Sequence, residues 1–286
     1  MTNPDPVRIV VLARQNSTRV QTASNQLESF LRERPALDLV DVIRDSDDEA
    51  SAQPAELCVV IGGDGAILRA CRAYDQQQIP ILGVNLGRLG FLADLSPDEF
   101  RNHIEAIERR EFQVVHHLML SCEHHKPNGT RERFLSLNEV AVLAGASLAM
   151  VDVELEIDGE RVTTYSGDGL IISTPVGSTA HNLSAGGPIL RQELQAVVIT
   201  PVCPHTLTNR PLVDDANCRY VLRVPEAPDG VTLVIDGQIK PPRLPKESLH
   251  IKRADVTFQL ARIPGHSYYA TLHRKLGWGG QPRYQY

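Results

Sequence analysis

The segment of residues 168–189, DGLIISTPVGSTAHNLSAGGPI, carries the densest set of ligand-binding groups in the chain. The apolar residues Leu170, Ile171 and Ile172 are followed by serines, threonines and glycines on both sides of Pro175. A buried strand that feeds a loop of hydroxyls and backbone N–H donors is typical of a cradle for a polyanion or a nucleotide. A flexible Gly/Ser linker fits less well, because linkers lack an apolar strand at their entry and a proline that fixes it.

A second glycine-rich block lies upstream. The β-branched run of residues 57–61 is followed by Gly62, Gly63, Asp64 and Gly65, and then by apolar residues at helical spacing. Strand, glycine turn and helix form an arrangement that lets backbone N–H groups face phosphates. The block is neither a G-x-G-x-x-G fingerprint nor a lysine-bearing phosphate loop, and it offers a carboxylate among glycines instead. The structural alternative is a tight turn with Asp64 as the helix N-cap.

Composition restricts the classes of function. The chain has 286 residues with a formal net charge of -6, so the basic surface expected of a nucleic-acid-binding protein is absent. The first residues show neither a signal peptide nor a membrane span. Five scattered cysteines, never in C-x-x-C, favour reduced thiols and a cytoplasmic protein.

The hydrophobic pattern predicts two domains. Residues 1–112 alternate strand and helix signals, which predicts an α/β domain with a parallel sheet and a ligand site at the carboxyl ends of its strands. The helix over 96–109 is expected to begin with Ser96 as its N-cap. The predicted strands are 8–13, 57–61 and 79–84, and the predicted helices are 22–34, the segment after GGDG, and 96–109.

From residue 113 to residue 264 the period drops toward two, which predicts an all-β, sandwich-like domain. Asp158 and Gly159 form a hairpin signal between two of its strands. The helix expected over 267–276 leads us to predict that residues 265–286 pack back on the first domain. The predicted strands are 118–123, 134–143, 151–157, 165–173, 196–201, 220–224, 231–235, 249–252 and 256–263.

Six motifs, in this order along the chain, resemble those of NAD kinases. They are GGDGAILRA, NLGRLGFLAD (85–94), LNEV (137–140), the block of residues 168–189, DGQ (236–238) and KLGWGG (275–280). The resemblance runs from about residue 8 to the C-terminus. It implies an α/β domain followed by an all-β domain, and transfer of the γ-phosphate of ATP to the 2′-hydroxyl of the adenosine ribose of NAD.

The resemblance also implies roles for individual residues. Asp64 matches the family's proton acceptor, although a carboxylate there could equally orient the acceptor hydroxyl or help to place Mg²⁺. Gly62, Gly63, Arg69 and Arg88 are expected at phosphates. The expected NAD contacts are Asp64, Gly65, Asn138, Glu139, Ser166, Asp168, Thr179, Ala180, His181, Asn182, Leu183, Ser184 and Gln238.

Several of these residues have ordinary structural interpretations as well. Asn138 and Glu139 could close a turn at a strand end, Arg88 could cap a loop, and Gln238 follows a common hairpin dipeptide. The segment of residues 184–187 could be a tight turn without ligand contact. The pairs at 116–117 and 124–125 are better explained by alternating exposure of histidines than by a metal site.

Three residues depart from the family pattern: Ala66 replaces threonine in GGDGT, Val176 stands where threonine is usual, and His181 replaces the tyrosine of STAY. An imidazole can stack on a base or bond a phosphate, and it titrates near neutrality. We therefore hypothesise that His181 makes the affinity for the dinucleotide depend on pH.

The functional expectation is thus an NAD kinase that uses ATP with Mg²⁺, or Mn²⁺ in its place. Polyphosphate as an alternative donor stays open, and a cytoplasmic homodimer or homotetramer without nucleic-acid or membrane partners is implied. Two other functions are retained. A lipid or sugar kinase shares GGDG but lacks LNEV with the long block, and a dinucleotide sensor without turnover would fit the three departures.

Overall fold

The computed structural model describes residues 5–13, 17–44, 50–87, 90–93, 95–145, 150–206, 208–226, 230–242, 247–263, 265 and 267–278. The chain divides into two compact units. One combines Met1–Val115 with Gln259–Tyr286, and the other is His116–Phe258. None of the helices in these ranges is long and apolar enough to cross a lipid bilayer.

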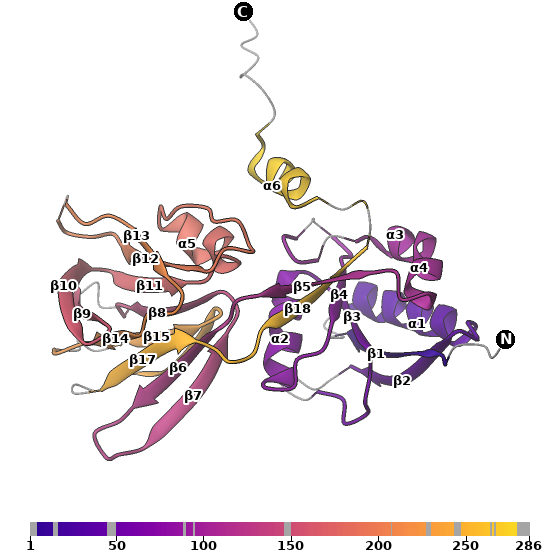
Figure 1. Ribbon diagram of the computed structural model, residues 1–286, viewed down its shortest axis with the longest axis horizontal. Helices are drawn as coiled ribbons and strands as arrows, with labels where there is room; N and C mark the ends of the chain where they lie inside the picture. Colours follow the sequence, from indigo (N-terminus) through magenta and orange to yellow (C-terminus); the bar gives the residue numbers. More distant parts are fainter. Residues whose placement is uncertain are drawn as a thin grey trace, which may run out of the picture. The chain divides into compact units, whose positions relative to one another are not determined.

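The first unit contains a six-stranded sheet in the order β2-β1-β3-β4-β18-β5 (Figure 1). The pairs β1–β2, β1–β3, β3–β4 and β4–β18 are parallel. The elements are β1 (Val7–Ala13), α1 (Thr18–Arg32), β2 (Leu37–Ile43), β3 (Leu57–Ile61), α2 (Asp64–Tyr74), β4 (Ile81–Val84), α3 (Pro97–Asn102), α4 (Ile104–Glu108), β5 (Gln113–His117), β18 (Phe258–Arg262) and α6 (Tyr268–Leu276).

Helices cover both faces of this sheet. Leu27 and Leu31 of α1 share a core cluster on one face with Phe100 of α3 and with residues of α4. Leu82 and Val84 of β4 join the same cluster. Because side chains alternate along a strand, Gly83 faces the other way, where Ile67 of α2 lies against it.

Local sequence determines where two helices begin, because a serine caps the N-terminus of each. Ser17 accepts a hydrogen bond from Val20 N at the start of α1, and Ser96 forms a capping box with Glu99 at the start of α3. Both helices are amphipathic or short, so packing on the sheet supplies most of their stability.

The second unit is built from two six-stranded sheets. Their orders are β10-β9-β14-β17-β6-β7 and β13-β12-β11-β8-β15-β16. Apolar residues of both sheets form one buried cluster. The strands are β6 (Leu120–His125), β7 (Arg131–Ser136), β8 (Glu139–Leu143), β9 (Val151–Ile157), β10 (Glu160–Gly167), β11 (Gly169–Ser173), β12 (Ala196–Val202), β13 (Leu212–Asp215), β14 (Tyr220–Arg223), β15 (Thr232–Ile235), β16 (Gln238–Pro242) and β17 (Ser248–Arg253).

The predicted fold class is confirmed, since a parallel α/β sheet is followed by an antiparallel two-sheet unit. Several boundaries are corrected. The apolar run at 256–263 was assigned to the β domain, but β18 pairs in parallel with β4 in the first unit. The expected single strand over 134–143 is interrupted between β7 and β8, and the helix over 96–109 is divided at His103. β2, β5, β13 and β16 were not predicted.

We expect Gly83→Ala to lower the free energy of unfolding. A Cβ atom there would lie 2.7 Å from Ile67 Cδ1 and 2.8 Å from Ala93 Cα, and overpacking of this kind costs about 1–3 kcal/mol. Urea unfolding of the full chain measures the change. Gly65→Ala is the matched control, because its Cβ meets no atom within 4 Å and alanine favours a helix. Equal effects of the two substitutions would contradict this packing.

Candidate functional site

The first predicted block forms the turn between β3 and α2. Gly63 is the N-cap of α2 and provides no side-chain bond, and Asp64 occupies the first turn of the helix. The carboxylate of Asp64 accepts hydrogen bonds from the backbone N–H groups of residues 91–93. Phe91 N lies 2.9 Å from Oδ2, and the nitrogens of residues 92 and 93 lie 3.0 and 3.1 Å from Oδ1.

Asp64 therefore holds the following loop instead of capping its own helix, which corrects the N-cap alternative. Gly90 is required by the same arrangement, because a Cβ on it would lie 2.8 Å from Asp64 Cγ. Gly63 and Gly65 face open space, with no atom within 4 Å of a Cβ built on either. A ligand can thus approach the backbone of this turn closely.

Two arginines, Arg69 and Arg88, are predicted at the phosphate site. Arg69 lies on α2 one helical turn beyond the loop and is half-buried. Arg88 lies outside the described residues. The structure thus places one of the two near the β3–α2 turn.

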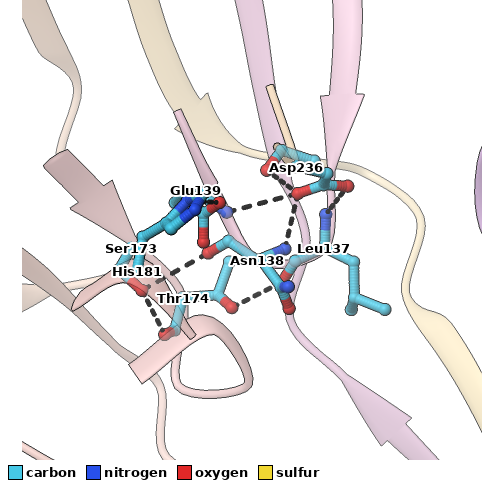
Figure 2. Close-up of polar contacts among 8 residues, drawn as sticks. Leu137, Asn138, Glu139, Ser173, Thr174, His181 and Asp236 are labelled. Atoms are coloured by element: carbon cyan, nitrogen blue, oxygen red, sulfur yellow. Dashed lines mark hydrogen bonds and ion pairs between the residues drawn. The ribbon is translucent and has the colours of Figure 1, made fainter. Parts of the chain in front are cut away.

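The LNEV motif lies where β7 ends and β8 begins, and the carboxylate of Asp236 organises it (Figure 2). Asp236 Oδ1 accepts from Ser136 Oγ at 2.7 Å, from Asn138 N at 2.8 Å and from Glu139 N at 3.2 Å. Its Oδ2 accepts from Leu137 N at 3.0 Å. The backbone on both sides of Asn138 is therefore fixed by one carboxylate.

Asp236 lies in a turn whose left-handed backbone conformation suits an aspartate. Its φ is 48° and that of Gly237 is 75°, so both central residues of the β15–β16 hairpin are left-handed, as in a type I′ turn. Asp is among the few residues that adopt this conformation readily. Burial raises the pKa of the Asp236 carboxyl, while the four donors act in the opposite direction.

Glu139 and His181 form a pair beside this turn. His181 Nδ1 lies 2.9 Å from Glu139 Oε1, and the histidine side chain is 56% exposed whereas that of the glutamate is 2% exposed (Figure 2). Burial raises the pKa of Glu139, and the nearby Asp236 carboxyl adds to the rise. The hydrogen bond to Glu139 raises the pKa of His181. The first shift follows from the low solvent access of the glutamate, and the second from the hydrogen bond that the pair makes.

The second block, after β11, packs directly on the LNEV turn. Thr174 N donates to Asn138 O at 2.9 Å, and Thr174 Oγ1 donates to Leu137 O at 2.6 Å while accepting from Gly177 N at 3.0 Å. Gly177 approaches the Asn138 backbone so closely that a Cβ would lie 2.5 Å from its carbonyl carbon. The glycine here is needed for close packing of two chain segments.

Residues 177–184 comprise the short helices η1 (Gly177–Thr179) and α5 (His181–Ser184). Thr179 and Ala180 are half-buried, while His181 and Ser184 are exposed. Thr179 Oγ1 donates to Val176 O at 3.1 Å. The structure thus brings Thr179, Ala180, His181, Leu183 and Ser184 together on one short segment.

Asn182 differs from its neighbours on this segment, because its side chain is completely buried. Its Nδ2 donates to Ser178 O and Pro188 O at 3.0 Å each, and its Oδ1 accepts from Thr200 Oγ1 at 2.6 Å. These bonds use both donors of the amide and its carbonyl, so the expected contact of this side chain with NAD is corrected to an internal role. Asn182 positions the loop.

Ser166 and Asp168 do not lie at the LNEV turn. β11 pairs with β8 so that Gly169 faces Leu143 at one end and Ser173 faces Glu139 at the other. Five strand residues span about 16 Å, which separates Asp168 from the LNEV turn within this unit. Asp168 is exposed and lies beside Cys203, whose pKa its carboxyl raises, and Ser166 Oγ donates to Asp152.

Gln238 begins β16, directly after the turn that contains Asp236. Its Oε1 accepts from Lys240 Nζ at 3.2 Å, and the Lys240 ammonium lies 5.2 Å from the Phe134 ring centroid. A Cβ on Gly237 would lie 3.9 Å from His181 Cε1. The start of β16 is therefore a neighbour of the Glu139–His181 pair.

The histidine pairs show the expected alternation. His116 is exposed and His117 buried, and His124 is buried while His125 is half-buried. His124 Nε2 bonds Glu247 Oε2 at 2.6 Å. Within the described ranges no group of three or more histidine, cysteine, aspartate or glutamate side chains could hold a metal ion.

Sequence reasoning missed the role of Asp236, which positions this site together with Thr174 and Ser178. Ser178 Oγ donates to Pro175 O at 2.6 Å and accepts from Leu190 N at 3.0 Å. The signal for Asp236 was present, because an Asp-Gly dipeptide between apolar runs predicts its hairpin turn. What it could not show was the carboxylate's partners about a hundred positions earlier.

Residues 9–112 match the ATP-NAD kinase N-terminal domain, and residues 137–263 match the ATP-NAD kinase C-terminal domain. An NAD kinase of Rhodopirellula baltica is 44% identical over 276 residues, which cover 96% of this chain and 88% of that protein. The chain belongs to the NAD kinase family.

Further relatives agree. An NAD kinase of Geobacter sulfurreducens is 36% identical over 280 residues, covering 95% of this chain and 99% of that protein. The crystal structure of an NAD kinase from Archaeoglobus fulgidus in complex with ATP matches with a TM-score of 0.74 and 27% identity over 96% of this chain and all of that one (100%). Yeast NADH kinase complexed with NADH has a TM-score of 0.88 at 21% identity, covering 98% of this chain and 90% of that one, and this likeness shows the fold alone.

The three residues that depart from the NAD kinase pattern lie in different environments. Ala66 and Val176 are buried, with 6% and 3% of their surface exposed. A hydroxyl at either position would need a partner inside the protein. His181 is the exposed departure, and it is the one that can meet a ligand directly.

Asp236→Ala should destabilise the second unit strongly. The substitution removes the acceptor of Ser136 Oγ and of the N–H groups of residues 137–139, and each buried donor left unsatisfied costs about 1–3 kcal/mol. We therefore expect the free energy of unfolding to fall by about 3 kcal/mol or more, measured by urea denaturation. Asp255→Ala, at an exposed position of the same unit, is the control. A loss below about 1 kcal/mol for Asp236→Ala would show that it does not organise the turn.

Proposed function

We propose that the chain is an ATP-dependent NAD kinase that transfers the γ-phosphate of ATP to the 2′-hydroxyl of the adenosine ribose of NAD, giving NADP. Membership of the family supports the reaction. The observation that carries the assignment of residues is the LNEV turn, where Asp236 fixes Asn138 and Glu139 beside the segment of residues 177–184.

The second unit recognises the dinucleotide in this proposal. Asn138 offers an amide that can pair with the edge of adenine, and Glu139 offers a carboxylate oxygen to ribose hydroxyls. Thr179, Ala180, Leu183 and Ser184 supply backbone and hydroxyl groups along the ligand, with Gln238 as a neighbour. Asn182 contributes by holding that segment in place.

Ser166 and Asp168 lie at the far end of β11 from the LNEV turn, so they cannot contact the same part of one bound nucleotide as Glu139 does. They stay in the proposal as contacts to another portion of the dinucleotide. The exposed carboxylate of Asp168 remains available for a hydroxyl there.

Asp64 is assigned to the reacting hydroxyl. Phosphoryl transfer has a loose transition state, so positioning and charge stabilisation supply most of the rate and a base adds about 10²-fold. Its Oδ2 accepts a single hydrogen bond, from Phe91 N, whereas Oδ1 accepts two. Oδ2 thus keeps the greater capacity to orient the hydroxyl and to take its proton.

The donor phosphates are assigned to the β3–α2 turn, which contains Gly62 and Gly63. The backbone of Gly63 faces open space, and Arg69 lies one helical turn further on. Arg88 is proposed for the same role from its sequence position. ATP enters with Mg²⁺, or Mn²⁺ in its place, because a divalent cation held largely by substrate phosphates needs one or two protein carboxylates at most. Asp64 is the carboxylate of this turn that would hold the cation, as the alternative to its role at the hydroxyl.

The remaining parts of the proposal rest on the resemblance and on composition. They are a cytoplasmic location and a homodimeric or homotetrameric state. All five cysteines lie in described parts of the chain and none is in a disulfide, which agrees with a reducing compartment. A lipid or sugar kinase is disfavoured by the match to both NAD kinase domains. A sensor without turnover is separated from the kinase by the following experiment.

We expect Asp64→Asn to lower NADP formation from NAD, ATP and Mg²⁺ by about 100-fold or more, because an amide cannot accept the proton. Calorimetry should show NAD affinity within a few-fold of the unaltered chain, since the proposed recognition groups lie in the second unit. Asp75→Asn makes the same chemical change at the exposed C-cap of the same helix and should leave turnover unchanged.

Comparable turnover by Asp64→Asn would remove Asp64 from the reaction. Absence of NADP formation by the unaltered chain, with NAD still bound, would favour the sensor.

A further inference from the structure

His181 is held by one edge of its ring. Its Nδ1 lies 2.9 Å from Glu139 Oε1, and an ionised carboxylate only accepts hydrogen bonds, so Nδ1 carries a proton when Glu139 is ionised. The other ring nitrogen, Nε2, then decides what the exposed edge of the side chain offers to a ligand. With 56% of the side chain exposed, that edge is open to a bound molecule.

We propose that His181 is a proton-switched binding residue, which donates a hydrogen bond from Nε2 to a phosphate oxygen of the bound dinucleotide when its ring is charged. The proposal rests on the function proposed above and specifies how this chain, with histidine in place of the tyrosine usual in the family, binds that ligand. The role is one of affinity and takes no part in bond making or breaking.

The two protonation states of imidazole offer different groups to a phosphate oxygen. With Nδ1 protonated and bonded to Glu139, the neutral ring has a lone pair on Nε2, which repels a phosphate oxygen. The charged ring has a proton on both nitrogens, and its Nε2–H forms a charge-assisted bond with that oxygen. A tyrosine hydroxyl at this position would stay neutral until about pH 10 and would show no such change.

Glu139 supplies the second observation. Its side chain is nearly completely buried, Oε1 bonds His181, and Oε2 is buried without a hydrogen-bond partner among the described residues. An unsatisfied buried acceptor is costly, and a ligand hydroxyl could satisfy it. Below the pKa of the histidine, the exposed edge of His181 offers a donor beside this unsatisfied, buried acceptor.

The charges that act on the ring are few in the described part of the chain. Glu139 on β8 faces His181 directly and raises the pKa of its imidazole above the ordinary value. Asp236, in the β15–β16 turn, acts on Glu139 and adds to the rise in the pKa of that carboxyl. Affinity for the dinucleotide should therefore be fully present at acidic pH and fall as pH rises through the raised pKa of His181.

The experiment measures the Kd of NAD by calorimetry between about pH 6 and 9 for the full-length chain, for His181→Tyr and for His273→Tyr. His273 is an exposed histidine on α6 and serves as the matched control. We expect Kd to rise about 10- to 100-fold with pH in the unaltered chain and in the control, and to stay flat in His181→Tyr. Repeating the titration near pH 8 in buffers of different ionisation enthalpy should show proton uptake on binding.

A readout independent of the ligand completes the test. The His181 ring is titrated by NMR in the free protein, where the midpoint should lie above about 6.5 and fall toward that value in Glu139→Gln. Identical pH profiles for the unaltered chain and His181→Tyr, or binding without proton uptake, would overturn the proposal. If NADP forms while Kd is independent of pH, the switch alone is wrong. If NAD neither binds nor reacts at any pH, both the switch and the proposed function are wrong.

Discussion

One interaction recurs in both units and fixes the candidate site: an aspartate carboxylate that accepts three successive backbone N–H groups. Asp64 accepts from residues 91–93, and Asp236 accepts from residues 137–139. Successive N–H groups that converge in this way form an anion-binding concavity. In each unit the protein's own carboxylate fills the concavity and so sets the path of a loop that carries predicted ligand contacts.

The Asp236 interaction also determines how neighbouring loops of the second unit pack. Fixing residues 137–139 places the carbonyl of Asn138 where Thr174 N and Ser173 Oγ donate to it, and this anchors the loop after β11. That loop in turn carries His181 to within hydrogen-bond distance of Glu139. The cost is two buried carboxyl groups: burial raises the pKa of both, and the Asp236 carboxyl adds to the rise for Glu139. Pairing with His181 offsets part of that cost.

The sequence was most informative where structure is local. The strand, glycine turn and helix around GGDG could be predicted because adjacent residues determine them, as could the N-cap at Ser96. β18 could not be assigned to its sheet, because an apolar run does not say which distant strand it will join. Asn182 was expected at the ligand, but burial of its amide depends on Thr200 and Pro188, which no short motif reveals. Asp236 likewise acts on residues far away in the chain, so its position in a DG turn predicted the hairpin and not the role.

The most direct test of the account is hydrogen–deuterium exchange of the full-length chain with and without saturating NAD. If the dinucleotide is recognised at the Asp236-organised turn, amide exchange should slow in residues 177–184 and 236–238. Exchange should stay unchanged in β6, on the other sheet of the same unit. Under conditions in which the chain makes NADP, unaltered exchange in residues 177–184, with protection confined to other parts of the second unit, would contradict it.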